Sequence, residues 1–125
     1  MKYMLLTYLD EKAWLALSPE EQEREMAQCA PHVEALLKTN KLIAGAPLYP
    51  TSSTTTIRYR DGKRLLTDGP FAEMREQLGG YALIEADNLD DAIAIASGFC
   101  GGNNTIEVRP IVELGGPVKS VPDAR

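Results

Sequence analysis

The sequence predicts one α+β domain in which two β-α-β units are separated by a β-hairpin. Three observations support this prediction. The chain of 125 residues has the length of a single domain. Short apolar stretches with strand periodicity alternate with two amphipathic helical stretches. Asp61-Gly62, a strong hairpin-turn signal, separates two strand-like segments. Because 44% of the residues are hydrophobic and 25% are charged, the composition is that of a globular domain with one core.

The first predicted elements are a strand and a helix. Residues 2–9 are rich in Leu, Tyr and Thr and too few for a stable helix, so we expect a buried strand. A helix should follow from Ser18, whose hydroxyl can cap it. Pro19 suits the first helical position, and Glu21 is placed to complete a capping box.

The same helical stretch contains signals for a break and a stop. Its apolar stripe consists of Met26, Cys29, Ala30, Val33 and Leu37. Pro31 lies inside this stripe, where it removes a backbone donor and clashes with the preceding turn, so we expect a kink or break at residues 27–30. Asn40 suits the left-handed conformation that ends many helices.

A short strand and a hairpin are expected next. Residues 42–46 form the strand, which Pro47 ends. Residues 54–60 are rich in β-branched side chains, and residues 63–67 return after the two-residue turn. This hairpin lies between the two β-α-β units as an insertion.

The second unit ends the domain. Residues 79–86 alternate as a strand, Asn88 can cap a helix through Asp91, and residues 105–113 form the last strand. The helix has an apolar stripe made of Leu89, Ala92, Ile93 and Ala96. This order predicts a ferredoxin-like arrangement, with two helices on one face of an antiparallel sheet. The domain is expected to span residues 1–114, followed by a flexible tail at 115–125.

Such a sheet leaves one face without helices. Leu5-Leu6 and residues 82–84 are apolar on both faces of their strands. A sheet of this kind is usually covered, so we expect a homodimer in which two copies cover each other's sheets.

Charge and hydropathy exclude several classes of partner. The net charge of −5 repels a phosphate backbone, so we expect no nucleic-acid partner. No apolar window approaches the roughly 18 to 20 residues of a membrane helix, and the first residues lack a signal-peptide cleavage pattern. We therefore expect a soluble, cytoplasmic protein with no membrane partner. Cys29 and Cys100 are expected to be two reduced, partly buried thiols, with a disulfide as the less favoured alternative.

Motifs for common cofactors are missing from the sequence. No glycine-rich dinucleotide loop follows a strand, and no Walker loop is present. One histidine and two distant cysteines supply too few ligands for a zinc or redox-metal site. We therefore expect no cofactor, while a carboxylate site for magnesium stays open.

Residues 67–81, TDGPFAEMREQLGGY, resemble the signature of the DGPF-type branch of the YCII-related family. The resemblance extends to residues 1–6, 42–47 and 105–111. It implies a dimeric α+β barrel, made when two ferredoxin-like sheets pack face to face, with a cleft in each subunit. Most members of the branch have no assigned activity and often occur beside extracytoplasmic-function sigma factors. Some relatives in the wider family look like enzymes that use a His and Asp pair in that cleft.

The signature loop supplies four candidate site residues. Asp68 can set a turn before Gly69-Pro70 or act as an acid or base, and Glu76 could share that chemistry. Phe71 can anchor the loop, and Arg75 can bind an anion. The alternative is a rigid turn with solvated ion pairs.

Three further candidates lie outside the loop or at its end. His32 is the only histidine and could act in acid-base catalysis, or it could bond locally. Tyr81 could donate a hydrogen bond to a ligand or serve only in packing. Arg109 could face the cleft or form a cross-strand ion pair with Glu85 or Lys2.

These residues support three hypotheses of function. The first is a dimeric YCII-related protein that binds a small molecule in a cleft near the Asp-Gly-Pro-Phe loop. The second is an acid-base enzyme of lyase or hydrolase type that uses Asp68 or Glu76 with His32. The third is a regulatory or interaction protein in a sigma-factor-linked pathway.

Overall fold

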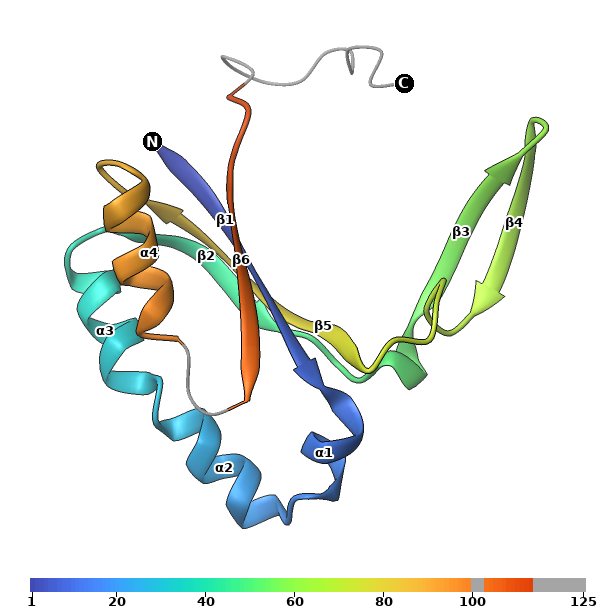
Figure 1. Ribbon diagram of the computed structural model, residues 1–125, viewed down its shortest axis with the longest axis horizontal. Coiled ribbons are helices and arrows are strands. Elements are labelled where there is room, and N and C mark those ends of the chain that lie inside the picture. Colours follow the sequence, from blue (N-terminus) through green and yellow to red (C-terminus); the bar gives the residue numbers. More distant parts are fainter. Residues whose placement is uncertain (100–102, 114–125) are drawn as a thin grey trace.

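The computed structural model describes residues 1–99 and 103–113 and has a mixed α+β fold, which confirms the predicted class (Figure 1). The strands are β1 (Lys2–Asp10), β2 (Leu42–Pro47), β3 (Thr55–Arg60), β4 (Lys63–Asp68), β5 (Glu76–Glu85) and β6 (Asn104–Pro110). The helices are α1 (Glu11–Ala16), α2 (Pro19–Ala27), α3 (Ala30–Lys38) and α4 (Leu89–Ser97), with a 3-10 turn, η1, at Thr51–Ser53.

Four strands form one sheet in the order β2-β5-β1-β6, and every neighbouring pair is antiparallel. β1 therefore runs parallel to β2, with β5 between them, and β5 runs parallel to β6, with β1 between them. β3 and β4 form a separate two-stranded sheet. Figure 1 shows this hairpin standing away from the larger sheet.

The core lies between the four-stranded sheet and helices α3 and α4, which lie side by side over one face (Figure 1). In the register of β1 and β5, Tyr3 is opposite Ile84 and Leu5 is opposite Ala82. The other buried core residues are Leu36, Ala86, Ala92, Ile95 and Ala96. Leu5 and Ile84 are only 1% and 0% exposed, so the central pair of strands is fully covered on this face.

Local signals in the sequence produce the helix ends as predicted. Ser18 and Glu21 form the capping box of α2, with Pro19 at its first turn. The helical stretch breaks between α2 and α3, and Pro31 lies at the start of α3, where its missing N–H costs no helical bond. Asn40 has a φ of 58°, the expected left-handed stop.

Three differences from the sequence prediction are larger than one residue. Helix α1 was not predicted, because its six residues are too few to show a helical period. β5 begins three residues earlier than expected, because β1 extends to Asp10 and pairs with Glu76. β6 ends at Pro110 rather than residue 113, because its partner β1 begins at Lys2. The predicted tail and Cys100 lie outside the described residues.

No helix in residues 1–99 and 103–113 is both long enough and apolar enough to cross a bilayer. In the same residues, no group of three or more His, Cys, Asp or Glu side chains is placed to hold a metal ion.

Candidate functional site

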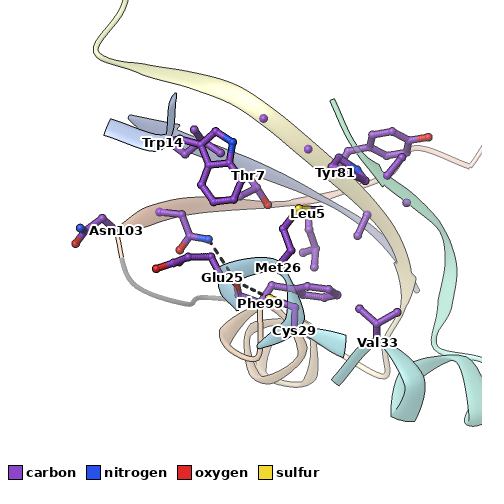
Figure 2. A pocket seen from close by; sticks show the side chains of 18 of the residues that line it. Leu5, Thr7, Trp14, Glu25, Met26, Cys29, Val33, Tyr81, Phe99 and Asn103 are labelled. Atoms are coloured by element: carbon purple, nitrogen blue, oxygen red, sulfur yellow. Dashed lines mark hydrogen bonds between the residues drawn. The ribbon is translucent and has the colours of Figure 1, made fainter. Parts of the chain in front are cut away.

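A cavity of about 550 Å³ lies between the four-stranded sheet and the first three helices (Figure 2). Strands β1, β2 and β5 form one side of it. The opposite side is made by five side chains from the helices and the segment after α4, namely Trp14, Met26, Cys29, Val33 and Phe99. The lining is mainly apolar, which is the usual character of small-molecule sites.

Small residues on the strands leave this space open. Gly79, Gly80 and Ala82 of β5 line the cavity beside Gly45 and Ala46 of β2. Because the side chains of these residues have one carbon or none, no large side chain projects from this part of the sheet toward the helices. The glycines and alanines therefore leave the space of the cavity, and the helices close it on the other side.

A β-bulge lies in the glycine-rich part of β5. Thr7 pairs with Gly80, whereas Tyr8 pairs with Leu78, so Gly79 is an extra residue in β5. A Cβ at Gly79 would lie 3.1 Å from Cγ of Leu9. A bulge bends its strand and increases the local twist. Helix α1, which follows directly after β1, forms the next part of the cavity wall.

Helix α1 places Trp14 over the cavity. Asp10 caps this helix, with its Oδ1 accepting a hydrogen bond from the backbone N–H of Ala13 at 3.1 Å. The Gln22 amide nitrogen on α2 donates to the Trp14 carbonyl oxygen at 3.0 Å. These two bonds fix α1 to the end of β1 and to α2, so the indole is held at the cavity wall.

One end of the cavity is polar. Glu25, Asn103 and Asn104 line it, and Figure 2 shows Glu25 and Asn103 together at this end. Asn104 takes an inward-facing position in β6, on the same face as the half-buried Ile106 and Val108. Its amide nitrogen donates to the Phe99 carbonyl oxygen at 3.3 Å, whereas its buried Oδ1 has no hydrogen-bond partner among the described residues.

A second hollow, of about 740 Å³, lies beside the signature loop. It is lined by Asp10, Glu11, Lys12, Ala13, Thr51, Pro70, Glu73, Met74, Arg75 and Gln77. Asp10 and Ala13 also line the apolar cavity, so the two hollows meet at the start of α1. The Ala13 N–H and then the Arg75 guanidinium, 3.4 Å away, lower the pKa of the Asp10 carboxyl.

The whole of this architecture falls within a known sequence family. The YCII-related domain matches residues 1–115. The chain belongs to the YCII-related family. An uncharacterized protein of Rhizobium meliloti (strain 1021) is 38% identical over 114 residues, which cover 89% of this chain and 92% of that protein. The resemblance to the YCII-related family is thus confirmed, while membership of its DGPF-type branch stays a prediction.

In this YCII-related chain the signature loop starts with a bend at the end of the hairpin. Asp68 is exposed at the last position of β4. Gly69 follows with a φ of 95°, and its N–H donates to the Thr54 carbonyl oxygen at 2.7 Å. Phe71 is 70% exposed, and its ring and carbonyl oxygen both contact the Arg58 guanidinium. The chain therefore bends at Gly69, while a turn set by the Asp68 side chain stays a prediction.

The later loop residues separate. Arg75 reaches Asp10 and lines the second hollow. Glu76 starts β5, and its Oε1 accepts a hydrogen bond from the Thr105 hydroxyl at 3.1 Å. Glu76 does not line either hollow.

His32 lies between α3 and α4. Its Nε2 is 2.8 Å from the Ile95 carbonyl oxygen, and its ring packs edge-on against Phe99 and beside Gly98. Within the described residues no hydrogen bond or ion pair joins His32 to Asp68 or Glu76. The three candidate acid-base residues thus occupy three different surroundings in one subunit.

Tyr81 is among the residues that line the cavity, but its side chain, like that of Arg109, lies on the sheet face without helices. Tyr81 is opposite Leu6 on β1, and Figure 2 shows its ring turned away from the cavity. Arg109 is opposite Met4. Next to it along this face, the Tyr8 hydroxyl donates to the Glu107 carboxylate, which together with burial raises the pKa of Tyr8.

Sequence reasoning missed Trp14 and Asn104, the two residues most distinctive of the cavity. A signal existed for each of them. Asp10 is a good helix cap four residues before Trp14, and Asn104 is a polar residue that continues the apolar row of Ile106 and Val108. A polar side chain at an inward-facing position of a strand needs a hydrogen-bond partner. Its presence in the sequence is therefore more informative than that of another apolar residue.

Proposed function

We propose that this YCII-related protein is a homodimer of ferredoxin-like subunits that each bind a small, largely apolar organic molecule in the cavity between the sheet and α1 to α3. The cavity itself carries this proposal. Its volume of about 550 Å³ lies within the range of roughly 300–1,000 Å³ that is typical of small-molecule sites. Apolar side chains dominate its lining, and the polar residues Glu25 and Asn103 lie together at one end.

We place the ligand in this cavity and not beside the signature loop, where the sequence analysis expected it. Lys12, Glu73 and Arg75, three of the charged residues that line the hollow beside the loop, are exposed, so water competes for them. The loop is still connected to the ligand site, because Arg75 bonds Asp10, a residue that lines both hollows. Its proposed role is to fix the start of α1 and thereby Trp14.

Two observations support the proposed dimer. The strand order and the two interleaved β-α-β units match a ferredoxin-like sheet, which carries helices on one face. On its other face Met4 lies opposite Leu83, and Leu6 lies opposite Tyr81, so an apolar row crosses the middle of the sheet. No helix of the described residues covers this row (Figure 1). Apolar sheet faces of this kind are usually buried by a partner.

The ligand proposal is tested with the fluorescence of Trp14, the only tryptophan in the chain. Phenylbutanol, a neutral apolar molecule, should shift the Trp14 emission in a saturable titration and raise the melting temperature. Val33→Phe should weaken this binding at least tenfold, because Val33 lines the cavity and the larger ring fills it. Leu37→Phe is the matched control on the same helix, since Leu37 is 55% exposed and does not line the cavity. Equal effects of the two variants would contradict the site, and no saturable response in the wild type would contradict ligand binding.

Light scattering after size-exclusion chromatography tests the dimer. The wild type should have twice the chain mass of 13.7 kDa. Leu83→Lys places a charge in the apolar row and should yield monomers, whereas Leu15→Lys on α1 should leave the dimer intact. Circular dichroism checks that both variants are folded. A monomeric wild type at micromolar concentration would contradict this part of the proposal.

A further inference from the structure

One face of the β3-β4 hairpin, residues 55–68, presents large apolar side chains to solvent in the single subunit. Directly opposite residues of a hairpin share a face, and so do residues two apart along one strand. Ile57 lies opposite Leu66, and Tyr59 is two positions after Ile57 on β3. Ile57 is 57% exposed, Leu66 58% and Tyr59 73%. We call these three residues the apolar hairpin face.

The opposite face of the hairpin is held by the chain that follows β4. The Thr56 hydroxyl donates to the Gly69 carbonyl oxygen at 2.7 Å, and the Arg58 guanidinium donates to the Phe71 carbonyl oxygen at 2.9 Å. Among the described residues, no hydrogen bond or ion pair joins the hairpin to the four-stranded sheet or to helices α1 to α4. A two-stranded hairpin alone is only marginally stable in water, so further packing should support it. The apolar hairpin face is the surface available for that packing.

The hairpin lies on the same side of the four-stranded sheet as the proposed dimer interface. Helices α3 and α4 pack on one side of this sheet, and the hairpin projects on the opposite side (Figure 1). The apolar row that the proposed dimer buries is on the sheet face without helices, where Met4 is opposite Leu83 and Leu6 is opposite Tyr81. A second copy that covers this row therefore lies beside the hairpin.

The charge of the hairpin is opposite in sign to that of the rest of the chain. Its charged residues are the four cations Arg58, Arg60, Lys63 and Arg64 and the two carboxylates Asp61 and Asp68. The hairpin thus carries +2, and because the whole chain carries −5, the other residues carry −7. Among the described residues, none of the four cations forms an ion pair. In a symmetric dimer each hairpin can face the acidic remainder of the other copy, so both contacts are complementary in charge.

We infer that the hairpin is an arm that packs on a second copy of this chain, with the apolar hairpin face against that copy and the cations toward its carboxylates. This inference rests on the proposed dimer and adds a contact to it besides the one between the sheets. A nucleic acid would neutralise the cations but leave the apolar face in water, whereas an acidic protein surface fits both features. The apolar contact supplies most of the affinity, because solvent screens exposed ion pairs.

Leu66→Thr and Leu65→Thr form a matched pair that tests the arm. The two residues are neighbours on β4, so they lie on opposite faces of the hairpin, and threonine suits a strand in both places. Analytical ultracentrifugation over a dilution series gives the dissociation constant of the dimer, and circular dichroism checks the fold. Leu66→Thr should raise the constant about tenfold, because the lost apolar contact occurs twice in a symmetric dimer, whereas Leu65→Thr should leave it unchanged. Equal constants for the two variants would overturn the inference.

Arg64→Glu tests the charge of the arm. Arg64 lies opposite Tyr59, on the same side as the apolar hairpin face. The substitution should raise the dissociation constant about tenfold at low salt and less at high salt, because salt screens the attraction. Lys38→Glu is the control, since Lys38 is exposed on α3 and its substitution changes the net charge equally. Equal effects of the two variants would show that net charge alone acts and would overturn the charge contact.

Thiol labelling of a Tyr59→Cys variant locates the contact. At concentrations where the variant is dimeric, a thiol reagent should modify position 59 at least fivefold more slowly than after dilution to monomers, because the second copy covers it. Thr67→Cys, on the opposite face, is the control and should be labelled at the same rate in both states. Peptide mass spectrometry separates these positions from Cys29 and Cys100. A dimer with unprotected position 59 would overturn this inference alone, whereas a monomeric wild type would overturn it together with the proposed dimer.

Discussion

The Arg75 guanidinium on the signature loop donates to the Asp10 carboxylate at the end of β1, with 3.4 Å between Nε and Oδ2. The other oxygen of Asp10 caps α1. One carboxylate thus ties together two segments 65 residues apart in sequence and stands between the two hollows. Because Arg75 is 90% exposed, solvent screens the ion pair, and the cap is the stronger of the two attachments.

Asp10→Asn should reduce the dependence of stability on pH in acid. The folded-state pKa of Asp10 lies below its ordinary value of 3.8, first because of the Ala13 N–H and then because of Arg75. A lowered pKa stabilises the fold above the ordinary value, and this contribution is lost as the pH falls through the folded-state pKa. The variant should therefore be less stable than the wild type near neutral pH, and the difference should shrink as the pH falls through the folded-state pKa of Asp10. Urea unfolding at a series of pH values measures it.

Asp87→Asn serves as the control for this experiment, because Asp87 is exposed and makes the same change of charge. Its difference from the wild type should depend less on pH than that of the Asp10 variant. If the free energy of unfolding depended on pH in the same way in both variants, net charge and not the contacts of Asp10 would set the loss of stability in acid.

Gly98→Ala should destabilise the protein by about 1–3 kcal/mol through overpacking. Gly98 has a φ of −73°, which alanine adopts easily, so the backbone causes no strain. The added Cβ would instead collide with the His32 ring, which is held by the Ile95 carbonyl oxygen and by Phe99. Thermal or urea unfolding gives the change in the free energy of unfolding.

His32→Ala provides the matched background for this substitution. With the ring removed, Gly98→Ala should be neutral or stabilising by about 0.5 kcal/mol, because alanine reduces the freedom of the unfolded chain. A loss of equal size in both backgrounds would mean that His32 is not the group that the new Cβ meets.

The features that were predicted correctly from the sequence depend on interactions between residues close together in the chain. The capping box at Ser18, the break before Pro31 and the stop at Asn40 depend on residues within one or two helical turns, and all three were predicted. The hairpin turn was equally local, since Asp61 and Gly62 both have positive φ angles.

The cavity depends on contacts that no local pattern contains. The bulge at Gly79 exists only relative to the register of β1, and the wall made by Trp14 requires a six-residue helix that has too few positions for a period. The unusual chemistry of residues 67–81 drew attention to the loop, but the structure places that loop at an exposed hollow. Its resemblance to a family signature indicated the family and not the position of the apolar cavity.

Glu107→Gln should lower the pKa of Tyr8 toward its ordinary value of 10.0. The hydrogen bond to Glu107 is the main cause of the raised pKa, and burial adds to it. Because the neutral phenol is favoured, the stabilisation is present below the ordinary pKa and is lost as the pH rises through the folded-state value. Tyrosine ring resonances in an NMR titration report the pKa, and Tyr8→Phe assigns the signal.

Arg109→Gln is the control of opposite sign for Tyr8. The positive charge of Arg109 lowers the pKa of Tyr8, so its removal should raise that pKa further. Shifts in the same direction for the Glu107 and Arg109 variants would contradict this assignment of causes.

Gln22→Leu should loosen α1 and expose Trp14. The Gln22 amide is the side-chain bond between α2 and the Trp14 carbonyl oxygen, and its loss leaves that part-buried oxygen with only the N–H of Leu17. We expect stability to fall by about 1 kcal/mol. Acrylamide should quench the single tryptophan more strongly than in the wild type, and phenylbutanol should bind more weakly. Gln28→Leu, at an exposed position after α2, is the control and should leave quenching unchanged. If quenching is unchanged in the Gln22 variant too, α1 is held by its Asp10 cap and the cavity wall does not depend on Gln22.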